Sequence, residues 1–143
     1  MNFTSLCSFA ILVLAFYSMV TTGSVSNEDN LGIDEPIDVH VIDRFDINTT
    51  PKLIIHCKSK DDDLGEHTLS SGDDFHWHFR VNFMRTTLFF CTMRWGQKVL
   101  SFDVFDAAHN RCKATLKCFW SIGEDGVYFG DGHSPNYLVY RWP

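Results

Sequence analysis

Residues 75–83 read Phe-His-Trp-His-Phe-Arg-Val-Asn-Phe, and they give the clearest indication of the fold class. Its odd-numbered positions are apolar and its even-numbered positions are polar. That two-residue period is typical of a β-strand with one buried and one solvated face. The side chains predicted to face the core are those of Phe75, Trp77, Phe79, Val81 and Phe83.

Other short stretches on either side of 75–83 also have the composition of strands. Residues 87–93 are apolar at both parities, which predicts a central strand covered on both faces. Gly96-Gln97 and Asp125-Gly126 lie between strand candidates and are typical of tight hairpin turns. The remaining candidates are 39–42, 53–57, 100–104, 118–122, 127–129 and 137–142. About eight short strands with such turns, and no helical period after residue 24, predict an all-β fold, a single antiparallel β-sandwich.

The composition limits the size and the partners of the protein. The chain has 143 residues, of which 45% are hydrophobic, enough for one packed domain. Its net charge of −6 comes entirely from residues 28–46, which hold seven acids and one base. The rest of the chain is neutral, so we expect no nucleic-acid partner and no polybasic contact with an anionic membrane.

The N-terminus predicts secretion. Residues 1–24 carry no charged side chain, and 9–20 form an apolar run that is short for a membrane span. We expect residues 1–23 to be a removed signal peptide, 24–37 a flexible acidic tail and 38–143 the folded domain. A short membrane anchor or a buried helix is the alternative, and the acidic residues that follow argue against both. The mature protein is expected to be extracellular and monomeric.

Four cysteines remain after removal of the signal peptide, and an even number in a small secreted domain predicts two disulfides. Sequence alone allows three pairings. The last two cysteines could close a five-residue loop or reach two different strands, and the spacing of all four argues against a zinc site. The four cysteines are Cys57, Cys91, Cys112 and Cys118, and Asn48-Thr49-Thr50 is a glycosylation sequon.

Two patterns raise the question of metal binding. His76 and His78 share one strand face at a spacing that can chelate zinc, but a catalytic zinc site needs a third protein ligand. We interpret the pair as the solvated side of the strand. Asp61-Asp62-Asp63 lacks the alternate acids of a calcium loop, so a solvated loop is the preferred interpretation. Histidines that could supply a third zinc ligand are His40, His56, His67, His109 and His133.

No sequence motif points to an enzyme. The chain has no phosphate-binding loop, no dinucleotide-binding glycine motif and no nucleophile elbow. We therefore expect no catalytic residues, no cofactor and no resident metal. Four tryptophans could form a sugar-binding platform, but they are more often core residues, and exposure of Trp95 or Trp142 would be needed to support sugar binding. The other two are Trp77 and Trp120.

Several blocks of sequence resemble the plant self-incompatibility protein S1 family, also called S-protein homologues. The most distinctive block is His-Cys-Lys-Ser-Lys-Asp-Asp-Asp-Leu-Gly at 56–65. Further matching blocks are Thr-Leu-Phe-Phe-Cys at 87–91, Cys-Phe-Trp-Ser-Ile at 118–122 and Glu-Asp-Gly-Val-Tyr at 124–128. The resemblance extends from Val39 to Trp142.

The resemblance implies a small secreted plant protein with a disulfide-bonded β-sandwich. The founding members of the family are stigma proteins that act as ligands of a pollen membrane protein and reject incompatible pollen. A rigid sandwich with variable loops suits recognition, so the exposed loops are the expected recognition surface. The candidate recognition residues are Glu66, Glu124, Asp125, Asp131 and His133.

The leading hypothesis is therefore an extracellular signalling ligand recognised by a plant cell-surface membrane protein. The alternative is a secreted defence protein or membrane-active toxin without a specific receptor. The neutral body of the domain and the lack of a basic amphipathic helix count against direct insertion into membranes. A zinc enzyme using His76 and His78, and a sugar-binding protein, remain further hypotheses.

Overall fold

A computed structural model describes residues 35–109, 111–112, 115–130 and 136–143. The proposed signal peptide and most of the proposed tail lie outside these residues. Within the described ranges there is no helix that could cross a membrane. The nine strands are β1 (Pro36–Asp43), β2 (Leu53–Lys58), β3 (Asp63–Leu69), β4 (Asp74–Arg80), β5 (Leu88–Trp95), β6 (Lys98–Asp106), β7 (Lys117–Gly123), β8 (Gly126–Gly130) and β9 (Tyr137–Arg141).

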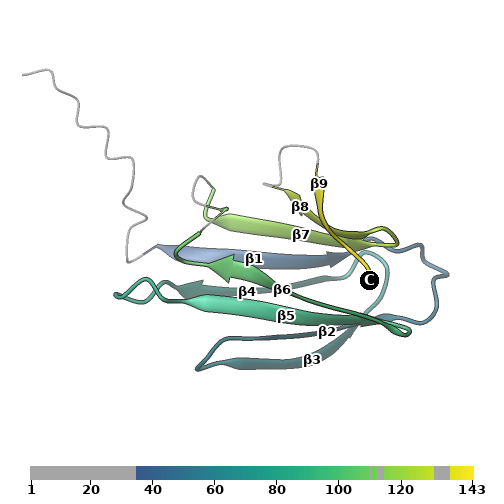
Figure 1. Ribbon diagram of the computed structural model, residues 1–143, viewed down its shortest axis with the longest axis horizontal. Coiled ribbons are helices and arrows are strands. Elements are labelled where there is room, and N and C mark those ends of the chain that lie inside the picture. The colour runs from purple at the N-terminus through teal and green to yellow at the C-terminus, as the bar shows by residue number, and fades with distance from the viewer. Residues whose placement is uncertain (1–34, 110, 113–114, 131–135) are drawn as a thin grey trace, which may run out of the picture. The chain divides into compact units, whose positions relative to one another are not determined.

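The strands form two sheets that face each other (Figure 1). One sheet has five strands in the order β4-β1-β7-β8-β9, and the other has four in the order β3-β2-β5-β6. The all-β sandwich is confirmed, but it is not purely antiparallel, because β1 and β7 pair in parallel. The first strand inserts between β4 and β7 instead of pairing with its neighbour in sequence, and no local pattern reveals such an insertion.

The core lies between the sheets and follows the alternation of each strand. Val39 and Val41 of β1 are fully buried, whereas His40 between them lies on the outer face. The Trp120 indole N–H of β7 donates a 3.0 Å hydrogen bond to the carbonyl of Val104 in β6, on the other sheet. Because this bond satisfies the indole inside the core, it helps to set how the two sheets pack.

The two predicted disulfides are present, and the structure decides their pairing. Cys57 of β2 is bonded to Cys91 of β5, at directly opposed positions of neighbouring strands. Cys112 is bonded to Cys118, which closes the short loop before β7.

Three predictions about individual strands were wrong. Strand β5 alternates between buried and half-buried positions, because a two-layer sandwich covers only one face of each sheet. Strand β4 ends at Arg80, so Phe83 is not in the core but 79% exposed. Strand β3 occupies residues for which the sequence predicted loops.

Candidate recognition surface

The directions of the strands gather the connections at the two ends of the sandwich. Connections 59–62 and 81–87 lie together at one end, at the left in Figure 1, where β2 and β4 finish and β3 and β5 begin. Connections 70–73, 96–97 and 124–125 lie at the opposite end. The sheets hold the bases of all five, as the recognition hypothesis requires.

Glu124 and Asp125 lie in the two-residue turn between β7 and β8 and are exposed. The Tyr128 hydroxyl donates a 3.1 Å hydrogen bond to Asp125 Oδ2. Partial burial and the adjacent Asp125 carboxylate raise the pKa of Tyr128, so this phenol remains a neutral donor. The turn is therefore a candidate recognition element. Asp131 and His133 lie outside the described residues.

Glu66 is not in a loop, although it remains exposed. It lies within β3, opposite His56 of β2, and its Oε2 is 3.5 Å from Nη2 of Arg94 on β5. Because β3 is an edge strand covered on one face only, its sequence is polar enough to resemble a loop. Glu66 thus forms an exposed ion pair with Arg94, between strands β3 and β5.

The three consecutive aspartates have separate roles. In the 59–62 turn, the backbone N–H groups of Asp61 and Asp62 donate to Ser59 Oγ at 3.3 and 3.0 Å. Asp63 begins β3, and its Oδ1 lies 2.6 Å from His56 Nε2. The hydrogen bond with His56 lowers the pKa of Asp63, with a smaller contribution from the Gly65 N–H. One of the three carboxylates is thus already paired, which disfavours a shared calcium ion.

A groove of about 480 Å³ separates the 59–62 turn from the 81–87 loop. Polar side chains line it, and they include charged ones of both signs, such as Lys60, Asp61 and Asp62. Aromatic side chains of Phe79, Phe89 and Phe90 also line it. A lining that combines aromatic side chains with a few polar groups is typical of sites that hold a protruding side chain of a partner.

The 81–87 loop is held by a dense set of hydrogen bonds centred on Asn82. The Asn82 N–H donates to Thr87 Oγ1 at 2.9 Å, and the Asn82 side-chain amide donates to Thr86 Oγ1 at 2.8 Å. In return, Asn82 Oδ1 accepts the Thr86 N–H at 2.8 Å, and its carbonyl accepts the Arg85 N–H at 2.9 Å. These bonds fix a tight turn whose two central residues are Phe83 and Met84.

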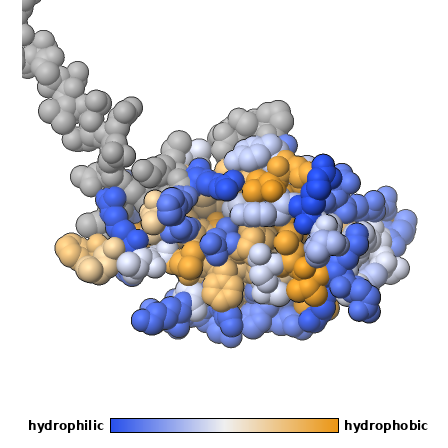
Figure 2. Space-filling view, viewed as in Figure 1, coloured by the Kyte–Doolittle hydropathy of each residue, from blue (hydrophilic) through white to orange (hydrophobic). Residues whose placement is uncertain are grey.

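Phe83 and Met84 are 79% and 75% exposed at the tip of this turn. Figure 2 shows an apolar projection at the end of the domain where Figure 1 places the connection between β4 and β5. The alternation of 75–83 predicts Phe83 in the core, and this prediction is wrong. The available signal was the break in alternation at Met84, where a second apolar residue follows Phe83 directly.

The two tryptophans that could have indicated sugar binding do not form an exposed platform. Trp142 is buried, and its indole N–H donates a 2.8 Å hydrogen bond to the Gly123 carbonyl. Trp95 packs between Trp142 and Phe45, with ring centroids 6.0 and 4.5 Å away. These contacts place both rings at the edge of the core. The exposed tryptophan that would have supported sugar binding is therefore found at neither position.

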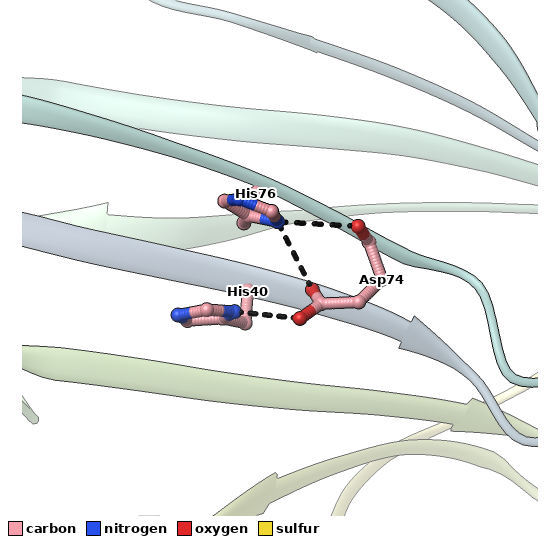
Figure 3. A group of neighbouring side chains, drawn as sticks. All are labelled: His40, Asp74 and His76. Atoms are coloured by element: carbon pink, nitrogen blue, oxygen red, sulfur yellow. Dashed lines mark hydrogen bonds and ion pairs between the residues drawn. The ribbon is translucent and has the colours of Figure 1, made fainter.

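The histidine pair at 76 and 78 does not act as a unit. His76 lies beside His40 and Asp74 on the outer face of the five-stranded sheet (Figure 3). His78 is also exposed but stands opposite Asp38, one step further along the strand face. Of the histidines that the sequence offered as a further ligand for the pair, His40 lies beside His76, together with Asp74 of β4.

Comparisons with known proteins agree with this architecture. The family model described as plant self-incompatibility protein S1 matches residues 38–142. S-protein homolog 24 of Arabidopsis thaliana is 35% identical over 141 residues, covering 95% of this chain and 90% of the relative. Self-incompatibility protein S1 of Papaver rhoeas is 36% identical over 91 residues, covering 61% of this chain and 64% of the relative.

One solved structure has the same fold. It is described as that of SPH (Self-Incompatibility Protein Homologue) proteins, a widespread family of small, highly stable, secreted proteins from plants. The match covers 76% of this chain and 95% of the solved chain, with a TM-score of 0.59 and 18% sequence identity. At this low identity the match establishes the β-sandwich fold alone. It gives no information on the function of the loops.

Proposed function

Because the chain belongs to the plant self-incompatibility protein S1 family, we propose that it is a secreted extracellular ligand recognised by a plant cell-surface membrane protein. The family's small proteins are secreted from plant cells, and this chain shares their disulfide-bonded β-sandwich. Relatives named for self-incompatibility support a role in recognition between cells. The action proposed is binding and not catalysis.

The observation that carries the proposal is the ordered 81–87 loop with its exposed Phe83 and Met84. Exposed apolar side chains on a flexible loop would lose entropy on binding, whereas those on a hydrogen-bonded turn lose little. Aromatic side chains are common anchors in protein interfaces, and methionine adapts to pockets of irregular shape. We therefore place the receptor contact at this end of the sandwich.

The adjacent groove complements the projecting pair. Its lining includes both Asp61 and Lys60, so a partner with a charged side chain of either sign can pair with it. A projection beside a groove allows each partner to insert a side chain into the other, which fixes the orientation of the complex. The expected partner surface is a folded ectodomain with an apolar pocket next to a polar protrusion.

The test is competition binding of labelled, disulfide-bonded protein to protoplasts from floral and vegetative tissue. We expect saturable binding to at least one cell type. The double substitution Phe83→Ser/Met84→Ser should weaken it more than about 30-fold, the effect of losing one strong interface anchor of about 2 kcal/mol. Ile47→Ser is the matched control, because Ile47 is 75% exposed in the connection between β1 and β2, outside this loop.

Two outcomes would contradict the proposal. Unchanged competition by the Phe83/Met84 variant would remove the loop from the receptor contact, and absence of competable binding on every tissue would remove the ligand role. A membrane-active toxin could also use two exposed apolar side chains, by inserting them into a bilayer. Leakage of protein-free lipid vesicles, lost in the same variant, would favour that second function.

A further inference from the structure

We propose that His40, Asp74 and His76 form a binding site for a single zinc ion on the outer face of the five-stranded sheet. The three residues come from β1 and β4, which are separated by more than thirty positions in sequence at the His40–Asp74 contact. No part of the recognition proposal depends on this site, since the 81–87 loop is formed by other residues.

The register of the sheet brings the three side chains to one face. His40 of β1 and His76 of β4 are directly opposed partners, so their side chains project side by side. Asp74 precedes His76 by two residues and therefore projects from the same face of β4. Both strands are regular here, so the backbone holds the donors at fixed positions, as a metal site requires.

The donor atoms are already close together. Asp74 Oδ2 lies 2.8 Å from His40 Nδ1, and Asp74 Oδ1 lies 3.8 Å from His76 Nδ1. One ligand atom from each residue lies within 4.8 Å of the others. Zinc bonds of about 2.0–2.2 Å in a tetrahedron separate neighbouring donors by roughly 3.4 Å. Small rotations of the side chains are therefore enough to admit the ion.

One of the three ligands is held firmly, and another faces solvent. The His40 ring stacks on Phe119 at 4.6 Å and on His76 at 5.2 Å, and its side chain is only 18% exposed. The His76 side chain is 64% exposed. Figure 3 shows the Nδ1 atoms of both imidazoles turned toward the Asp74 carboxylate. An ion can enter from the solvent side without displacing core residues.

The donor set selects the class of metal. Two imidazole nitrogens and one carboxylate oxygen suit zinc and other late first-row divalent ions, whereas calcium and magnesium prefer oxygen donors alone. Three protein ligands leave a fourth tetrahedral position for water. The carboxylate charge also partly offsets that of the dication.

The experiment is calorimetric titration of zinc into the tag-free, disulfide-bonded secreted protein. We expect one zinc per chain and a rise in Tm that grows with zinc concentration. His76→Ala and Asp74→Asn should each weaken binding more than about tenfold, since even outer-shell partners of metals contribute 10- to 100-fold. Histidine ring NMR signals should shift on zinc addition for His40 and His76 together.

Two variants serve as matched controls. His78→Ala removes an exposed histidine from the same strand face, and His56→Ala removes one whose carboxylate partner is Asp63 alone among the described side chains. Both should bind zinc as the unaltered protein does. Circular dichroism verifies that every variant is folded.

The proposal is overturned by absence of zinc binding to the folded protein, which would mean that the cluster is only a hydrogen-bonded set in which both histidines contact Asp74. Equal losses in His78→Ala and His76→Ala would also overturn it, by showing a diffuse histidine surface. Calcium binding as tight as zinc binding would contradict the nitrogen donors. Copper(II) should bind at the same residues and displace zinc, in the usual order of affinities.

Discussion

Asp43 shows how one buried carboxyl orders an end of the sandwich. It is 2% exposed at the end of β1, and its Oδ1 accepts a 2.8 Å hydrogen bond from the N–H of Phe45. Its backbone carbonyl accepts the Gly72 N–H, and its N–H donates to Asp73, both at 2.9 Å. Burial raises the pKa of Asp43, although the Phe45 N–H and the charge of Lys52 act against the change.

Two substitutions of Asp43 should distinguish the effect of its hydrogen bond on stability from the effect of its charge. Asp43→Ala leaves the Phe45 N–H without its acceptor and should cost about 1–3 kcal/mol in the free energy of unfolding. Asp43→Asn keeps an acceptor and removes a charge that burial disfavours, so it should be at least as stable as the unaltered protein near pH 7. Urea unfolding measures both, and an Asn variant as unstable as the Ala variant would contradict this account.

The raised pKa of Asp43 also predicts how the stability of the folded protein depends on pH. Because the folded-state pKa lies above the unfolded value of 3.8, folding favours the protonated carboxyl. The resulting stability is fully present below pH 3.8 and is lost as the pH rises through the folded-state pKa. The advantage of the Asn variant should therefore be larger at about pH 7 than at about pH 4.

Among the strands, a comparison of the edge strands β3 and β4 shows why one polar strand could be predicted and the other could not. Each is covered on one face only, so half of its residues are polar. In β4 the polar half alternates regularly and the strand was predicted. In β3 the residues around Gly65, which has a φ of 78°, interrupt the alternation, and a bulge in its pairing with β2 adds a further irregularity.

The hairpin of β7 and β8 depends on a glycine that opens β8. Gly126 has a φ of 146°, and a Cβ there would overlap the backbone of Tyr140 and Arg141 in β9. Gly126→Ala should therefore cost more than about 2 kcal/mol in denaturant unfolding. Gly72→Ala is the control, since Gly72 also has a positive φ but no atom near the added Cβ, and it should cost only about 1–2 kcal/mol. Equal costs would show that the overlap is relieved by small shifts.

Across the whole domain, one disulfide links two strands of a sheet and the other closes a short loop. Cys57–Cys91 joins β2 and β5 at a sequence separation of 34, whereas the separation of Cys112 and Cys118 is 6. A covalent link removes more conformational freedom from the unfolded chain when the loop that it closes is longer. The first disulfide thus stabilises the sheet, and the second mainly shapes one connection.

Paired alanine substitutions should reveal this difference. By chain entropy, removing Cys57–Cys91 should cost roughly 4 kcal/mol and removing Cys112–Cys118 roughly 2 kcal/mol. Guanidinium unfolding of the Cys57→Ala/Cys91→Ala and Cys112→Ala/Cys118→Ala proteins measures both. A larger cost for the short loop would mean that native packing around it, and not loop entropy, dominates.

The fold class, the number of disulfides and the family could all be predicted from the amino-acid sequence. Alternation such as that of 75–80 is set by the two-residue period of a strand, turn residues mark hairpins locally, and cysteines can be counted. The insertion of β1 between β4 and β7, and the contact of His40 with His76, could not be predicted and are seen only in the folded domain. A local pattern sets only which face of its strand a side chain takes. Which strand lies beside it depends on how all the faces of the chain are buried together.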